Sequence, residues 1–132
     1  MNSILVKIIM PSEVIFKANA TMVNIPGGDG VFGVLPNHVK LTSTVAIGSI
    51  SVFSEDKEKK FFIYGGMAQI TPLEINIVSE FVVSLDDHKK SDVLNKIASL
   101  KSDLDSCEEN SLEASMLNAT ITKYNSLLKF CE

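Results

Sequence analysis

Glycine and proline divide this sequence into two parts that follow different rules. All seven glycines lie between Gly27 and Gly66, and the last of the four prolines is Pro72. Residues 73–132 contain neither residue type. Both weaken helix interiors and are common in the turns between strands. The pattern therefore predicts a strand-rich N-terminal part and a C-terminal part that can form long helices.

Short apolar runs with alternating side chains occur throughout residues 1–84. Ile4, Val6 and Ile8 alternate with their neighbours, and Pro11 then turns the chain into the next run. Many short runs of this kind, separated by turn residues, are typical of a β-sandwich or barrel. The run Phe61–Tyr64 is apolar on both faces, which indicates that something also covers its outer face. Further alternating runs surround Val23, Ile50, Ile75 and Ile77.

Polar and glycine-rich segments predict where these strands end. The charged segment 55–60 is expected to form a solvated hairpin turn. Gly65-Gly66 and Thr71-Pro72 are expected to bracket a separate short strand.

The apolar period becomes helical after Asp87. Two stripes at helical spacing predict a hairpin of two antiparallel helices that pack along a narrow seam. Asp86 and Asp87 are expected to face the positive end of the first helix dipole, and Asn110 with Glu113 resembles a capping box. The predicted domains are a sandwich over 1–84 and a hairpin over 88–132, with 85–87 as the linker. The stripes contain Val93, Ile97, Leu100 and Leu104, then Leu117, Ile121, Tyr124, Leu128 and Cys131.

Composition and charge argue against several classes of function. The formal net charge is −4 and all twelve basic residues are lysines, so we expect no nucleic-acid partner. No apolar run approaches the roughly 20 residues that span a bilayer, and no secretory signal is expected, so direct membrane insertion is not predicted. The two cysteines, Cys107 and Cys131, offer neither a disulfide framework nor metal-ligand spacing, and both are interpreted as free thiols in a reducing compartment.

The loop 25–41 carries four glycines and His38, which raises the question of phosphate binding or catalysis. A P-loop requires Gly-Lys-Ser/Thr at the start of a helix, and here strand-like residues follow instead. Gly28, Gly30 and Gly33 fit a dinucleotide spacing, but no βαβ unit surrounds them. His38 has only Asp29 as a nearby acid and no nucleophile. We therefore expect no catalytic, metal or cofactor site, and interpret the loop as a protein-binding turn.

The segment from Ile25 to His38 resembles the signature of the epsilon chain of the rotary ATP synthase. The pattern is a small residue and glycine, an acid, glycine, a third glycine after two residues, and then Pro-x-His. Gly48-Ser49-Ile50 and Tyr64-Gly65-Gly66-Met67 also match. The resemblance covers nearly the whole chain in order, including the two-helix tail.

The resemblance implies a flattened antiparallel β-sandwich followed by a helical hairpin. It also implies a non-catalytic central-stalk subunit without a cofactor, peripheral to the cytoplasmic face of the energy-coupling inner membrane. Such a subunit couples the gamma shaft to the ring of membrane subunits, and the catalytic beta chain is a further partner. By position, Asp29, Gly30, Val31 and Phe32 would contact the ring, whereas Met10, His38 and Thr42 would lie near gamma.

The sequence departs from this family in two places. Family members often carry an acid at the position of Val31, so a drier ring contact is expected here. In some relatives the hairpin inhibits hydrolysis or binds ATP through a Leu/Ile-Asp-x-x-Arg-Ala motif. The corresponding segment, 85–90, has lysine instead of arginine and cannot make paired guanidinium contacts. The second helix also has few basic residues. We therefore expect a mobile hairpin, modest inhibition at most, and no tight ATP binding.

Two other functions are open to a chain of this composition. One is a free-standing β-sandwich that binds a peptide or small ligand, with the helices capping a sheet edge. The other is a hydrolase, which would need a nucleophile and base that the sequence does not supply.

Overall fold

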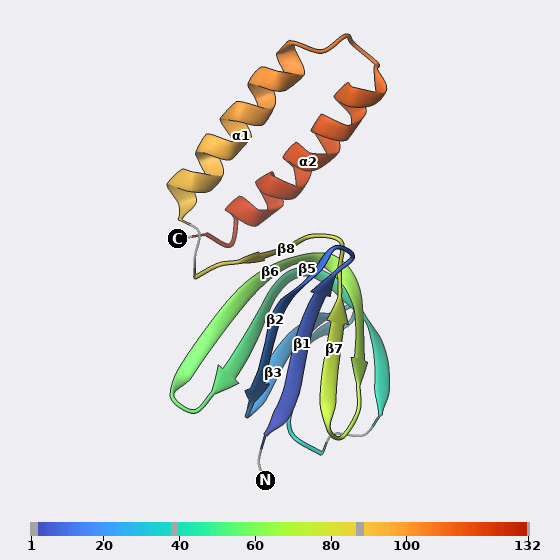
Figure 1. Cartoon of the computed structure of the whole chain (residues 1–132), viewed down its shortest axis with the longest axis vertical. Helices are drawn as coiled ribbons and strands as arrows, with labels where there is room; N and C mark the ends of the chain where they lie inside the picture. Colours follow the sequence, from blue (N-terminus) through green and yellow to red (C-terminus); the bar gives the residue numbers. More distant parts are fainter. Residues whose placement is uncertain (1–2, 38–39, 87–88, 132) are drawn as a thin grey trace. The chain divides into compact units, whose positions relative to one another are not determined.

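A computed structural model describes residues 3–37, 40–86 and 89–131 of the chain (Figure 1). The chain divides into two compact units, the sandwich unit (Met1–Asp86) and the hairpin unit (Asp87–Glu132). The predicted fold class, a β-sandwich followed by two helices, is confirmed. The elements are β1 (Ile4–Met10), β2 (Glu13–Ala20), β3 (Met22–Gly27), β4 (Gly30–Val34), β5 (Leu41–Ser54), β6 (Lys57–Ile70), β7 (Glu74–Val78), β8 (Val82–Ser84), α1 (Lys90–Asp105) and α2 (Leu112–Leu128).

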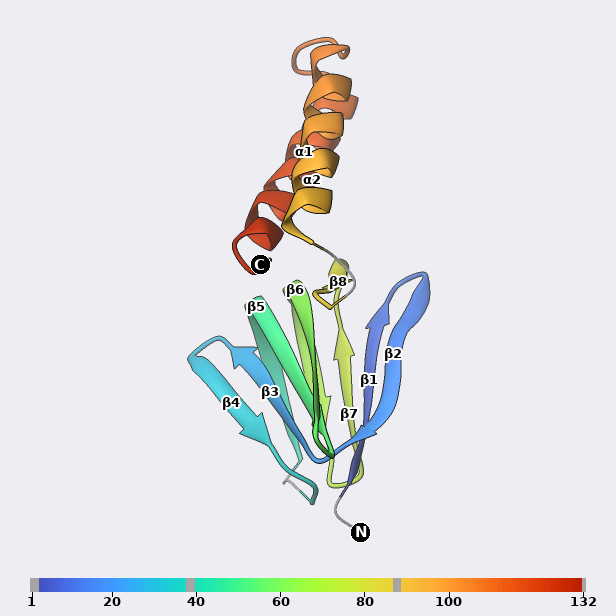
Figure 2. The same ribbon diagram turned by 90° about the vertical axis from the view of Figure 1, so that its left-hand side faces the viewer.

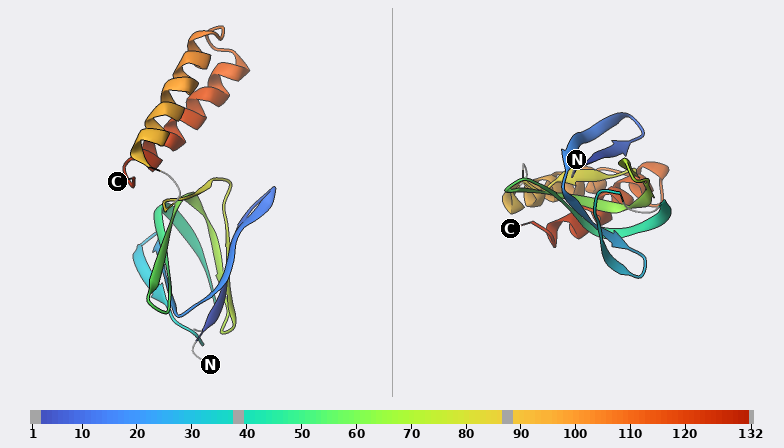
Figure 3. Two further views of the ribbon diagram at one scale, coloured as in Figure 1. Left: turned by 60° about the vertical axis from the view of Figure 1, so that its left-hand side comes forward. Right: turned by 90° about the horizontal axis from the view of Figure 1, so that it is seen from below.

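The strands of the sandwich unit form one continuous sheet that folds over on itself. Their order is β2-β1-β7-β6-β5-β3-β4, and β8 also pairs with β6. Figure 2 shows β3 and β4 on one side of this unit and β1 and β2 on the other, and Figure 3 shows the curvature of the strands from two further directions. Neighbouring strands are antiparallel except for β1 and β7, which are parallel, so the sheet is mixed.

Strands β5 and β6 link the two layers because each is 14 residues long. One half of β6 pairs with β8 through residues 61–63, and the other pairs with β7 through residues 67–70. Gly65 and Gly66 lie between these halves at φ 78° and 155°. The prediction that they end a strand is therefore wrong, since β6 continues through them and bends there.

The segment 55–60 also differs from its prediction. Only Glu55 and Asp56 form the turn between β5 and β6, with Glu55 at φ 53°. Lys57–Lys60 already belong to β6 and pair with β5. Their charged side chains are exposed, so a polar sequence here marks a solvated strand end rather than a long loop.

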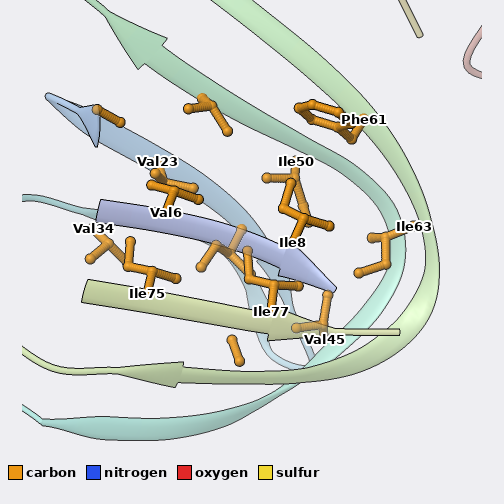
Figure 4. Close-up of a cluster of buried hydrophobic side chains, with 14 of the residues drawn as sticks. Val6, Ile8, Val23, Val34, Val45, Ile50, Phe61, Ile63, Ile75 and Ile77 are labelled. Atoms are coloured by element: carbon orange, nitrogen blue, oxygen red, sulfur yellow. The ribbon is translucent and has the colours of Figure 1, made fainter. Parts of the chain in front are cut away.

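The core of the sandwich unit lies between the two layers. Val6 and Ile8 from β1 face the same interior as Ile75 and Ile77 from β7, and all four are fully buried (Figure 4). Burying one such side chain stabilises the fold by about 1.5–3 kcal/mol, so this alternation fixes which face of each strand turns inward. The opposite layer contributes Val23, Ile50, Phe61 and Ile63.

The hairpin unit follows the predicted helical stripes with small shifts. Val93, Ile97 and Leu100 of α1 are buried, but in α2 Leu127 is fully buried where Leu128 was expected. The N-cap of α2 is Ser111, whose Oγ accepts the backbone N–H of Ala114 at 3.1 Å. Asn110 lies one residue earlier at φ 61°, and N3 is Ala114, whose methyl group cannot complete a capping box, so the predicted capping box of Asn110 and Glu113 is wrong.

The acid in the first turn of α1 is Asp92. Asp92 Oδ2 accepts the backbone N–H of Lys89 at 3.3 Å. Asp86, by contrast, accepts the backbone N–H of Lys60 at 3.3 Å within the sandwich unit. Asp87 lies outside the described residues.

Candidate protein-binding surface

The glycine-rich segment forms the tight hairpin that joins β3 to β4. Gly28 and Asp29 make the turn, and Gly27 pairs with Gly30 directly beside it. Gly30 has φ 127°, a conformation that favours glycine. Asp29 is exposed, and 71% of the Val31 surface is accessible. The turn therefore presents one carboxylate and one apolar side chain on a short, well-paired hairpin.

Phe32 is less exposed than Asp29 and Val31. It pairs with Ile25 across the hairpin and packs against the core, with its ring also lying over the backbone of Gly27. A Cβ on Gly27 would lie 2.8 Å from Cε1 of Phe32, so only glycine leaves room for the ring. Phe32 is therefore only partly exposed, and its ring anchors the turn.

The three residues that the resemblance assigned to gamma have different environments. Thr42 is exposed in β5, opposite Gln69 of β6. Met10 is half-buried and packs against the core. His38 lies outside the described residues.

An exposed, mainly apolar row crosses five neighbouring strands on the outer face of the sheet. We call it the outer row, and it consists of Val14, Ile9, Val78, Met67 and Thr44, each paired with the next. Val14, Val78 and Met67 expose 55%, 47% and 48% of their surfaces. An apolar strip of this extent on a small domain is typical of a protein-binding surface.

The outer row ends at the glycine-rich turn. Thr44 Oγ1 would lie 3.3 Å from a Cβ on Gly28, and Thr44 also lines a hollow of about 460 Å³ beside the turn. The turn and the outer row thus form one continuous surface. The other residues that line this hollow are Gly27, Gly28, Asp29, Gly30, Val31, Phe32, Leu41 and Ser43.

A second hollow, of about 440 Å³, opens beside Met67 and Val78. Its floor is the β6 bend, where Ser79 Oγ donates a 2.6 Å hydrogen bond to the carbonyl of Gly65 and accepts the N–H of Phe81 at 3.3 Å. Ser79 is buried, and its bond to Gly65 ties the segment after β7 to β6 at the bend. Pro11, Tyr64, Gly66 and Glu80 complete the lining. This hollow was not predicted because it arises from strands distant in sequence; the pair Gly65-Gly66 is the one signal that could have indicated it.

No group of three or more His, Cys, Asp or Glu residues in the described ranges could hold a metal ion. Cys107 and Cys131 are free thiols. Partial burial and the neighbouring Glu113 raise the pKa of Cys107, and burial raises the pKa of Cys131 although Lys90 opposes this. Neither helix has the length and hydropathy that crossing a bilayer requires, as far as the described residues extend.

Together, the folded sheet, the glycine-rich turn and the C-terminal hairpin define a small two-unit β-sandwich protein. The family described as ATP synthase, Delta/Epsilon chain, beta-sandwich domain matches residues 3–84. The chain belongs to this family. It is 38% identical over 94 residues to the ATP synthase epsilon chain of Rickettsia typhi, covering 69% of this chain and 86% of the relative. The epsilon chain of Maricaulis maris is 28% identical over 120 residues, covering 91% and 90%.

Solved structures share the fold. One chain of the mitochondrial ATP synthase of Euglena gracilis, in a structure of OSCP, F1 and the c-ring, superposes with a TM-score of 0.66 over 96% of this chain and 78% of its own, at 18% identity. A chain from the central stalk and c-ring of the Tetrahymena thermophila mitochondrial enzyme gives a TM-score of 0.54 over 95% of this chain and 96% of its own, at 9% identity. At these identities the likeness concerns the fold alone.

Proposed function

We propose that this chain is the non-catalytic epsilon subunit of a rotary ATP synthase and couples rotation of the gamma shaft to the membrane ring. The observation that carries the proposal is the continuous surface formed by the glycine-rich turn and the outer row. A coupling subunit must hold two partners at once, and one surface with two chemically different ends suits that task. The subunit would be peripheral to the cytoplasmic face of the energy-coupling membrane.

The turn is the part of this surface that we assign to the ring. Asp29 and Val31 are the exposed side chains that would contact the polar loops of ring subunits. Gly30 lets the backbone approach closely, and Phe32 fixes the turn from the core side. Because Val31 is apolar, this contact should depend less on salt than one made by two acids.

The outer row is the part that we assign to gamma. Thr42 lies on the same outer face, one row away, and Met10 supports β1 from the core side. His38 precedes Thr42 by four positions in the sequence and is assigned to gamma by the resemblance alone. The catalytic beta chain is a third partner through the hairpin unit, with modest inhibition of hydrolysis at most.

The assignment of the turn is tested by Val31→Glu in the full synthase. Proton-driven ATP synthesis in inverted membrane vesicles should fall, by about tenfold if one desolvated apolar contact is lost. Leu73→Glu is a matched control, because it places a carboxylate on an exposed apolar residue between β6 and β7, outside both the turn and the outer row. Phe32→Glu is unsuitable, since it would also disturb the core.

Unfolding measurements on the isolated variants should show equal stability. Unchanged synthesis with Val31→Glu would remove the ring assignment.

A further inference from the structure

The hollow beside the β6 bend combines apolar walls with a single carboxylate. Met67, Val78 and Pro11 supply apolar surface, and Glu80 stands in the segment between β7 and β8 with its side chain exposed. Among the residues that the structure describes, Glu80 makes no ion pair. An unpaired carboxylate beside an apolar hollow is suited to forming an ion pair with a basic side chain of a binding partner.

The carboxylate of Glu74, on the same face, already has partners. Lys7 Nζ lies 3.8 Å from Glu74 Oε2, and Asn76 Nδ2 donates to Glu74 Oε1 at 3.1 Å. This group lies one row away from the hollow, since Lys7 pairs with Asn76 and Ile9 pairs with Val78. Glu74 is therefore engaged locally, whereas Glu80 is available to a partner.

The base of the hollow is held together by close contacts, which favours a defined occupant. A Cβ on Gly66 would overlap the carbonyl oxygen of Val78, so the backbones of β6 and β7 lie too close together there for any side chain on residue 66. Ser79 ties the same point to Gly65 through its 2.6 Å hydrogen bond. A preformed pocket costs little ordering on binding, and such pockets hold the anchoring side chains of protein interfaces.

We propose that this hollow is the specificity pocket for gamma, and that it takes an apolar gamma side chain next to a lysine or arginine that pairs with Glu80. The inference rests on the proposed function and adds the chemistry of the partner segment. Charge complementarity selects this occupant: the carboxylate excludes an acidic or purely apolar segment, and the apolar walls exclude a purely basic one.

The test measures binding of the full chain to a gamma-containing catalytic head that lacks this subunit. At low salt, Glu80→Gln should weaken binding about tenfold and Glu80→Lys further, because the latter sets like charges together. Both losses should shrink at high salt. Met67→Ser should also weaken binding about tenfold, but equally at both salt concentrations. Asp56→Lys, at the exposed turn between β5 and β6, makes the same charge change away from the hollow and should bind as the unaltered chain does.

The possible results separate this inference from the function on which it rests. If the unaltered chain binds and Glu80→Lys binds no worse than Asp56→Lys, the inference is overturned and the proposed function stands. If the unaltered chain does not bind the head, both are lost. Self-association of the isolated chain that Met67→Ser abolishes would assign the hollow to a second copy and overturn the inference as well.

Discussion

Gly65 and Gly66 show how single residues decide the path of the whole sheet. Both have positive φ, and β6 bends between its β8-paired and β7-paired halves at this point. From sequence alone a glycine pair reads as a strand end, because glycine is common in turns. The difference lies in Val78 and Ser79, whose contacts hold the bend and are distant in sequence.

Replacing Gly66 with alanine should therefore destabilise the sandwich unit. The new Cβ would overlap the Val78 carbonyl oxygen and force a backbone shift, at a cost of about 2–4 kcal/mol. Urea unfolding followed by circular dichroism measures this as a lower midpoint at an unchanged slope. Gly28→Ala is the matched control, since its Cβ would meet only Thr44 Oγ1 at 3.3 Å, and equal stability of the two variants would refute the role given to Gly66.

Part of the candidate site could be predicted from the sequence, residue by residue. Turn chemistry correctly placed Asp29 and Val31 on an exposed hairpin. It could not place Phe32, because the side to which this ring turns depends on its pairing with Ile25 across the hairpin. The outer row could not be predicted either, since it draws one residue from each of five strands.

The local sequence pattern was sufficient to predict whether a segment forms a helix or a strand, but not which strands pair with each other. Period-two runs predicted strands, and helical stripes predicted α1 and α2 with a shift of one residue at Leu127. The parallel pair β1–β7 joins segments about seventy residues apart in the chain, as Val6 opposite Ile75 shows, and nothing local specifies it. The full length of β5 and β6 could not be predicted either, because glycines interrupt the alternating pattern without ending the strand.

The segment that precedes α1 leads to a prediction about nucleotide binding. Lys89 stands where the resemblance would put the arginine of the ATP-binding motif, and the carboxylate of Asp86 already accepts a hydrogen bond from the backbone of Lys60. The full chain should therefore bind ATP weakly. In calorimetric titration, a dissociation constant at or below about 10 μM, equivalent to about 7 kcal/mol, would show that the arginine-free segment suffices.

Over the chain as a whole, the net charge is divided equally between the sandwich unit and the hairpin unit. Residues 1–86 contain eight acids and six lysines, and residues 87–132 contain the same numbers, so each unit carries −2 of the total of −4. Neither unit has the basic surplus that would attract an acidic partner segment. Apolar contact along the outer row, aided by local charges such as Glu80, is then the main source of affinity for gamma under the proposed function.

Co-purification is the most direct way to ask whether this chain works within an ATP synthase. The chain would be tagged in its own cells, extracted in mild detergent and isolated, and the bound chains identified by mass spectrometry. We expect stoichiometric gamma and beta chains together with the ring subunit, and loss of gamma when Glu80 is replaced by lysine. Recovery of the tagged chain without gamma or beta, from cells whose synthase is intact, would contradict the proposed function.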